Sequence, residues 1–245
     1  MGPFNCRRSW PGKAGLSPAI DFANLCPAEN LTYGRITLGN MTQPAIRPAD
    51  PGDAQLASRL ITLSMGELAD YLFGGTHLSV DEILTGLFLL EGNRFSRTIV
   101  VFAEWDGQPA GMLVSFPGWE FARRELAIGL GLLKLCGLWD VLRLSVPALS
   151  IANGVETYRD EYYLANMAVF PDFRGRGIGS ALLGHAEEKA RRAGLKKCSL
   201  IVDTENPAAR RLYERCGYKI VFTKTYPGPA ENAHAGYHRM LKEVE

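Results

Sequence analysis

The clearest pattern of hydrophobic and polar positions along the chain lies at residues 177–193. Apolar residues recur there at the spacing of one helix face: Ile178, Leu182, Leu183, Ala186 and Ala190. The opposite face carries acids that are each followed four residues later by a base, the favourable order in a helix: Glu187 with Arg191 and Glu188 with Arg192. Gly194 follows as an expected C-terminal cap. The pattern predicts an amphipathic helix.

Two earlier helices are predicted from the residues that open them. Asp50 followed by Pro51 favours a helix start, and the helix is expected to cover about 51–70. Ser79, with Glu82 three residues later, forms a capping box that opens a second helix over about 80–90.

Strand signals surround these helices. A short strand is predicted at 43–47, and segments 98–105 and 109–116 are predicted to pair as antiparallel strands. Asp106-Gly107 between them is typical of a hairpin turn. The first half of the chain therefore predicts a strand, two helices and a hairpin.

Residues 117–160 carry a mixed signal. Helical spacing is interrupted there by Gly129, Gly131, Gly137 and Pro147, which predicts one or two short helices. An apolar insert of this size has four alternative roles: a lid, a wall of a substrate pocket, a dimer surface, or further cover for the core.

The elements after the insert alternate between strand and helix. Strands are predicted at 162–170 and 197–203, and the helix at 177–193 lies between them. Asn206-Pro207 opens a helix that runs to about Cys216. Segments 219–224 and 234–242 are expected to close the fold as an antiparallel pair. The predicted class is mixed α/β (α+β).

Composition narrows the class of protein. With 47% hydrophobic and 22% charged residues among 245, the chain is expected to fold as one soluble globular domain. The 27 Lys and Arg nearly balance the 26 Asp and Glu. Because there is no overall basic field, we expect no nucleic-acid partner and no membrane partner.

The cysteines and the N-terminal segment bear on location. Five widely spaced cysteines without a CxxC pair favour a reduced, cytoplasmic interior and no zinc site. No uncharged stretch is long enough to span a bilayer. Residues 1–42 have no helical or alternating pattern and no secretory h-region. We expect them to be disordered or outside the fold, with residues 43–245 forming one domain.

The loop at 174–179, with sequence RGRGIG, carries the first sign of chemistry. It joins a strand to a helix, so the first amides of that helix have no partner within it. Gly177 and Gly179 allow close approach to the backbone. The helix dipole, Arg174 and Arg176 add positive charge beside it. These features predict a cradle for a pyrophosphate.

Two other interpretations of the loop are weaker. One is a glycine-rich turn with two solvated arginines. The other is a dinucleotide site, because the loop follows a strand and Asp203 ends the next one. The GxGxxG pattern fails in both registers, however, since its last position falls on Ser180 or on Leu182. Only about 40 residues follow Asp203, too few for a doubly wound sheet.

The segment 161–222 resembles the GNAT superfamily of N-acyltransferases. The residues that carry the resemblance are Val169-Phe170-Pro171, the motif Arg174-Gly175-Arg176-Gly177-Ile178-Gly179, and the downstream run from Asn206 to Tyr218. Over 43–116 only the order of elements is similar. The resemblance implies a GNAT fold: a central mixed, mostly antiparallel sheet, flanked by helices and splayed between the strands near 162–170 and 197–203.

The resemblance also implies how acyl-CoA binds. Its pyrophosphate would lie on the amides of Arg174, Gly175, Arg176, Gly177, Ile178, Gly179 and Ser180. Its pantetheine would run beside Met167, Ala168 and Val169, where the strand splays from its neighbour at Ser199 to Val202. The amide of Val169 would polarise the thioester carbonyl. Asn206 would contact the cofactor near its reactive end, besides capping its helix.

Acyl transfer to an amine also needs an acid and a base. By resemblance, Tyr213 is the acid that protonates the departing thiolate; its alternative is a core aromatic. The family's frequent strand glutamate would fall at position 163, where this chain has Tyr163. Glu161, two residues earlier on the same predicted face, is the candidate base. We expect no metal, because His234 and His238 lie on a predicted strand without a third ligand.

The predicted function is an N-acyltransferase that moves acetyl, or another short acyl group, from acyl-CoA to a primary amine by direct attack in a ternary complex. The alternative is a CoA-binding sensor or interaction module of the same fold that has lost its chemistry. The predicted partners are acyl-CoA and an amine acceptor, and a second copy of the chain is an open alternative.

Overall fold

A computed structural model describes residues 43–151, 156–225 and 236–245, with the backbone alone for 146–151. The chain divides into two compact units, Met1–Gly39 and Asn40–Glu245, and every described residue lies in the second. Residues 1–42, which are expected to be disordered or outside the fold, are not among the described residues, and neither is His234. The predicted start of the domain at residue 43 therefore stays a prediction.

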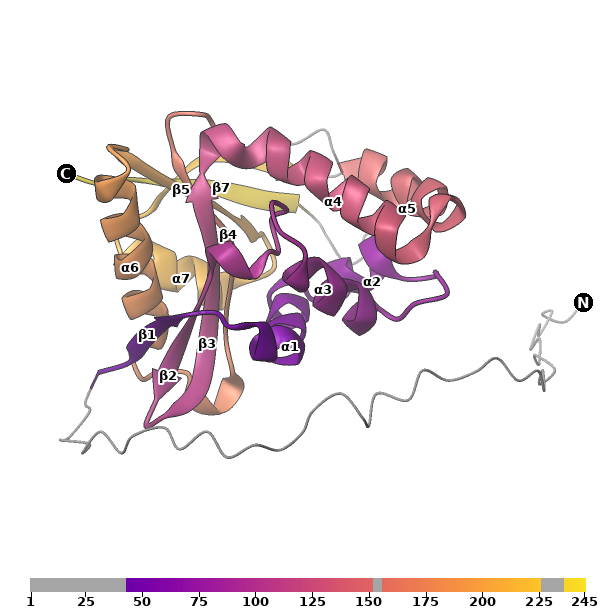
Figure 1. Ribbon diagram of the computed structural model, residues 1–245. Helices are drawn as coiled ribbons and strands as arrows, with labels where there is room; N and C mark the ends of the chain where they lie inside the picture. Colours follow the sequence, from indigo (N-terminus) through magenta and orange to yellow (C-terminus); the bar gives the residue numbers. More distant parts are fainter. Residues whose placement is uncertain (1–42, 152–155, 226–235) are drawn as a thin grey trace, which may run out of the picture. The chain divides into compact units, whose positions relative to one another are not determined.

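The described residues form one sheet of seven strands in the order β1-β2-β3-β4-β5-β7-β6 (Figure 1). The strands are Ala45–Pro48 (β1), Val100–Trp105 (β2), Gln108–Pro117 (β3), Tyr162–Val169 (β4), Lys197–Asp203 (β5), Lys219–Thr225 (β6) and Gly236–Glu243 (β7). Of the neighbouring pairs, β4 and β5 run parallel and the others antiparallel. This confirms the predicted mixed, mostly antiparallel sheet.

Helices cover both faces of the sheet (Figure 1). One face packs against α1 (Ala54–Met65), α2 (Glu67–Phe73), α3 (Val80–Leu89), α4 (Phe121–Cys136) and α5 (Leu138–Ile151). The other face packs against α6 (Ile178–Arg192) and α7 (Pro207–Arg215). Successive residues of a strand pack on opposite faces of the sheet. Met112 and Val114 of β3 pack in the core on the face covered by α1, and Leu113 packs in the core on the face covered by α6.

The first predicted helix is two helices in the structure. Gly66 separates α1 from α2 with φ of 59°, in the region that favours glycine. The prediction of one helix over 51–70 is therefore wrong at its C-terminal half. The capping box of the next helix is confirmed, because Glu82 N donates to Ser79 Oγ and Ser79 N donates to the Glu82 carboxylate.

The insert forms two helices, and neither is short. α4 has 16 residues and α5 has 14. Gly131 does not break α4 but packs it closely against α3, because a Cβ there would lie 2.8 Å from Leu87 Cδ2. Gly137, with φ of 80°, supplies the turn between the two helices.

The apolar face predicted for 177–193 is buried in α6 as expected. Its charged face differs in one respect. Glu188 pairs with Arg192 at 2.9 Å, but Glu187 is buried and pairs with Lys242 of β7 at 2.7 Å. The predicted pair of Glu187 with Arg191 is therefore wrong, because Glu187 points inward to a strand that the helix pattern could not reveal.

Strands β4 and β5 pair over only part of their length. Their parallel register runs from Tyr162↔Cys198 to Leu164↔Leu200, although β4 continues to Val169. A register shift in the β3–β4 ladder leaves Ala165 as an extra residue just beyond this point. The strands therefore diverge after Leu200, within the range predicted from Ser199 to Val202, and beyond this point no described strand pairs with that edge of β4.

Candidate active site

The loop after β4 presents unpaired amides at the start of α6. Gly177 is the N-cap in a left-handed conformation, with φ of 79°, and Gly175 has the same φ. The first bond of the helix runs from Ala181 N to Gly177 O at 3.0 Å. The amides of Ile178, Gly179 and Ser180 precede it and have no partner among the described residues. The structure thus contains the predicted anion cradle as a geometric feature.

The two arginines of the loop are held in different ways. The amide of Arg174 donates to Pro171 O at 3.1 Å and its Nε donates to Val169 O at 3.2 Å. In this conformation the Arg174 amide is therefore engaged in a turn and not free for a phosphate. The Arg176 guanidinium lies over the rings of Phe173 and Trp105, 5.4 and 5.7 Å from their centroids.

The free edge of β4 offers alternate backbone groups to a ligand. Phe170 N donates to Ala110 O at 2.9 Å, so this amide points toward β3. Because amides alternate along a strand, those of Met167 and Val169 point the other way, to the side from which β5 has diverged. The backbone of Ala168 faces β3, where its carbonyl lies 2.8 Å from an ideal Cβ on Gly111.

Helix α7 lies against the start of α6. A Cβ on Gly179 would lie 2.7 Å from Leu212 Cδ2, so any larger residue there would have to displace the Leu212 side chain. Asn206 caps α7 as predicted, with its Oδ1 accepting from Ala209 N at 3.0 Å. The loop and α7 are thus brought together as the sequence motif predicts.

Tyr213 of α7 is buried in the same core as the inner side chains of β4. Met167 and Val169 pack against that core, and the Tyr213 ring lies 6.2 Å from the ring of Tyr218. Burial raises the pKa of Tyr213 to about 12. Its phenol is therefore protonated at neutral pH, as a proton donor must be.

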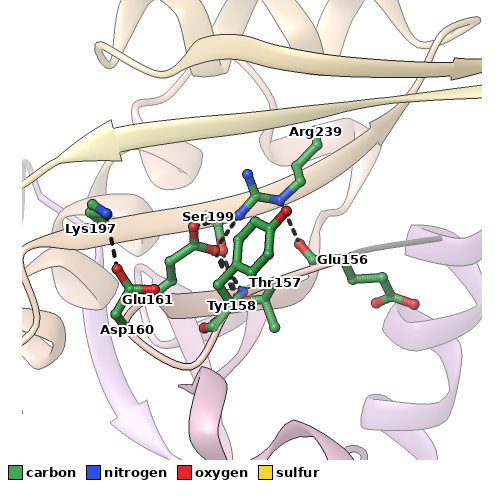
Figure 2. Close-up of polar contacts among 8 residues, drawn as sticks. All are labelled: Glu156, Thr157, Tyr158, Asp160, Glu161, Lys197, Ser199 and Arg239. Atoms are coloured by element: carbon green, nitrogen blue, oxygen red, sulfur yellow. Dashed lines mark hydrogen bonds and ion pairs between the residues drawn. The ribbon is translucent and has the colours of Figure 1, made fainter.

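Glu161 is held in a buried ion pair (Figure 2). Both of its carboxylate oxygens accept from Nη2 of Arg239 in β7. Thr157 Oγ1 and Tyr158 N donate to the same carboxylate at 3.1 and 3.0 Å. Glu161 and Arg239 are 2% and 5% exposed. The geometry favours a structural role, because a base would have to give up these partners before taking a proton.

A second carboxylate, that of Glu156, contacts the side chain at position 163. Tyr163 is fully buried and its hydroxyl donates to Glu156 Oε2 at 2.5 Å. Burial, followed by the charge of Glu156, raises the pKa of Tyr163 well above its usual range. The side chain of Glu156 is 26% exposed and also bonds Arg94 at 3.2 Å. Sequence reasoning missed Glu156, because only the fold brings its chain segment to β4.

Arg94 joins Glu156 to a third carboxylate. Its Nη1 donates to Glu125 of α4 at 2.9 Å, and its guanidinium lies over the rings of Phe121 and Tyr163. Burial raises the pKa of Glu125, although the charge of Arg94 opposes this shift. The insert is thereby connected through one arginine to the strand that carries the candidate site.

Three other features of the described residues bear on function. No three His, Cys, Asp or Glu side chains in them gather as metal ligands would. Over the same residues, every helix is too short or too polar to cross a membrane. Their three cysteines, Cys136, Cys198 and Cys216, are free thiols.

Comparison with known proteins decides the family. The family model described as Acetyltransferase (GNAT) family matches residues 67–218. The chain belongs to this family. The GNAT match covers the splayed strands, the glycine loop and Tyr213, and it includes the α4–α5 insert within its span.

Individual relatives agree with this assignment. An acetyltransferase of Pectobacterium atrosepticum is 38% identical over 72 residues, which are 29% of this chain and 50% of the relative. The chain thus spans about half the length of this relative and of a similar acetyltransferase from Sodalis glossinidius. The crystal structure of an acetyltransferase is 30% identical with a TM-score of 0.63, covering 82% of this chain and all of the other.

A second solved structure supports the fold alone. The N-acetyltransferase from Staphylococcus aureus Mu50 is 23% identical with a TM-score of 0.62, over 81% of this chain and all of the other. The GNAT fold predicted from the sequence is confirmed by these likenesses.

The cradle can be tested at Gly177. Replacing it with alanine places a Cβ in the open space above the loop, where no protein atom lies within 4 Å. We expect CoA affinity to fall roughly tenfold, measured by calorimetry, and stability to fall by about 1 kcal/mol because of the positive φ. Gly184→Ala, on an exposed turn of α6, is the matched control and should leave CoA affinity unchanged. Equal CoA affinities for both variants would contradict the assignment.

The Glu161–Arg239 pair can be tested through stability. Glu161→Gln leaves a buried arginine without its charge partner, and we expect the free energy of unfolding to fall by about 3 kcal/mol. The double variant Glu161→Leu with Arg239→Met should recover most of that loss. Urea titrations of the three proteins measure it. A Glu161→Gln variant that is fully stable but inactive would instead assign Glu161 to the chemistry.

Proposed function

We propose that this GNAT protein transfers an acyl group, acetyl in the simplest case, from acyl-CoA to a primary amine by direct attack in a ternary complex. The observation that carries the proposal is the divergence of β4 from β5 after Leu164 and Leu200, beside the free amides of the following loop. A thioester cofactor that binds along that edge would contact both the unpaired side of β4 and the free amides of the loop.

The cofactor is held by backbone groups in this proposal. The pyrophosphate lies on the amides from Ile178 to Ser180, where the helix dipole favours negative charge. The pantetheine amides bond to the free edge of β4 as an added strand would. The amide of Val169 then donates to the thioester carbonyl and stabilises the negative charge that develops on its oxygen.

The reaction transfers one acyl group; the acceptor ammonium loses two protons and the departing thiolate gains one, so one proton is released overall. A base takes a proton from the ammonium form of the acceptor, and the neutral nitrogen attacks the thioester carbonyl carbon. A C–N bond forms, the C–S bond breaks, and the departing thiolate takes the phenolic proton of Tyr213. The new amide loses its second proton to solvent, and solvent protonates Tyr213 again.

Glu156 is a better candidate for the base than Glu161. It is bonded to Tyr163, which occupies the position of the family's frequent strand glutamate, and a quarter of its side chain is exposed. Glu161 is enclosed by Arg239, Thr157 and Tyr158. The amine proton passes to Glu156 directly or through a water, and from there to solvent.

A CoA-binding module without chemistry remains the rival, because Tyr163 replaces the usual glutamate. Incubation of the full chain with acetyl-CoA and a panel of primary amines distinguishes the two. We expect release of one free thiol for each amide formed, measured with a thiol reagent and by mass spectrometry. Binding of CoA by calorimetry with no thiol release for any amine would favour the rival.

The acid is tested by Tyr213→Phe. This change removes one hydroxyl from a buried ring, so we expect kcat to fall by about a hundredfold while CoA affinity stays unchanged. Because the pKa of Tyr213 is raised to about 12, the wild-type rate should show no alkaline loss from this group up to about pH 10. An unchanged kcat in the variant would assign Tyr213 to packing alone.

The base is tested by a matched pair of variants. Glu156→Gln and Glu125→Gln each remove one carboxylate from Arg94, but only Glu156 touches Tyr163. We expect kcat/KM to fall by about a hundredfold for Glu156→Gln. Glu125→Gln should keep the wild-type kcat/KM. Parallel losses in both variants would point to Arg94 and the fold instead.

A further inference from the structure

Helices α4 and α5 carry an apolar face that no described residue covers. Its exposed side chains are Leu126, Leu130, Leu133, Leu138, Trp139 and Leu142, and they are here called the hairpin face. They recur at helical spacing on the sides of α4 and α5 opposite to the buried Leu132, Cys136 and Leu144. The two helices are therefore apolar on both sides, and contact with the core buries only one of these sides.

The degree of exposure sets this face apart from isolated surface leucines. Trp139 is 84% exposed, and Leu126 and Leu130 are 67% and 62% exposed. Single exposed apolar residues are normal, whereas a contiguous apolar surface on a folded protein marks an interaction site. Tryptophan is among the side chains that gain most by leaving water.

The exposed charges on α4 and α5 are of one sign. Among the described side chains of these helices they are Arg123, Lys134 and Arg143, of which Arg123 pairs with Glu120, directly before α4, at 3.3 Å. The two carboxylates of these helices are held by partners: Glu125 by Arg94 at 2.9 Å and Asp140 by His77 at 2.5 Å. The chain's near-zero net charge, from which no membrane partner is expected, thus conceals a local basic surface.

We propose that the hairpin face docks on the surface of a bilayer that contains anionic phospholipids. Leucine and tryptophan side chains enter the boundary between headgroups and acyl chains, and the exposed basic side chains of Lys134 and Arg143 contact lipid phosphates. Charge favours this occupant over a second copy of the chain. A two-fold interface through the hairpin face would bring these positive side chains near their copies, and the described side chains of α4 and α5 include no exposed acid to pair with them.

The proposal is independent of the acyl-transfer chemistry, and its test uses the full chain. Flotation with vesicles of phosphatidylcholine, with and without phosphatidylglycerol, should show binding only when the anionic lipid is present. Binding should weaken as salt is raised, because the headgroup attraction is screened. Replacing Lys134 and Arg143 together by glutamine should lower the partition coefficient by about fivefold for each charge removed.

A pair of charge-matched variants locates the surface. Leu130→Glu places an acid in the hairpin face and should reduce vesicle binding to background. Phe222→Glu makes the same charge change at a side chain of β6 that is 50% exposed, and should bind within about twofold of wild type. Thermal unfolding confirms that both variants are folded.

Three outcomes would overturn the proposal. One is the absence of wild-type binding to the anionic vesicles. Another is an equal effect of Leu130→Glu and Phe222→Glu. The third is a wild-type dimer in analytical ultracentrifugation that Leu130→Glu converts to a monomer without any vesicle binding, which would make the hairpin face an interface between copies of the chain.

Discussion

The candidate site depends on one constraint, the end of pairing between β4 and β5 after Leu164 and Leu200. Each strand is held on its other side by an antiparallel partner: β4 by β3 as far as Val169, and β5 by β7 as far as Asp203. The extra residue Ala165 adds local twist to β4 at the point of separation. The open edge therefore follows from the pairing of the whole sheet, and it needs no ligand to exist.

The register of β4 then decides which of its amides face the open edge. A slip of one residue would turn the amide of Val169 toward β3 and expose that of Ala168. The strand enters the sheet from the segment 156–161, which two arginines from distant parts of the chain fix in place. Arg239 holds Glu161 and Arg94 holds Glu156. Such buried pairs add little net stability over apolar packing, and their value here lies in fixing one register.

Much of the fold was predictable because its signals are local. The glycine loop, the Asn206 cap and the apolar face of α6 each lie within a few residues, and the structure contains all three. The contacts that the sequence did not predict involve partners distant in sequence. Glu187 pairs with Lys242 and Glu161 pairs with Arg239, which lie 55 and 78 residues away along the chain. The break at Gly66 was missed because one glycine among good helix formers is a weak signal.

The two ends of the insert, which adjoin β3 and β4, lie next to each other. Gly118 N, directly after β3, donates to Glu161 O at 2.7 Å directly before β4, so both ends of the insert are tied together. A Cβ on Gly118 would lie 2.0 Å from Tyr158 O, so the closure requires glycine. The contact from Arg94 to Glu125 is the one described ion pair that links α4 to Glu156, so it connects this helix of the insert to the candidate base.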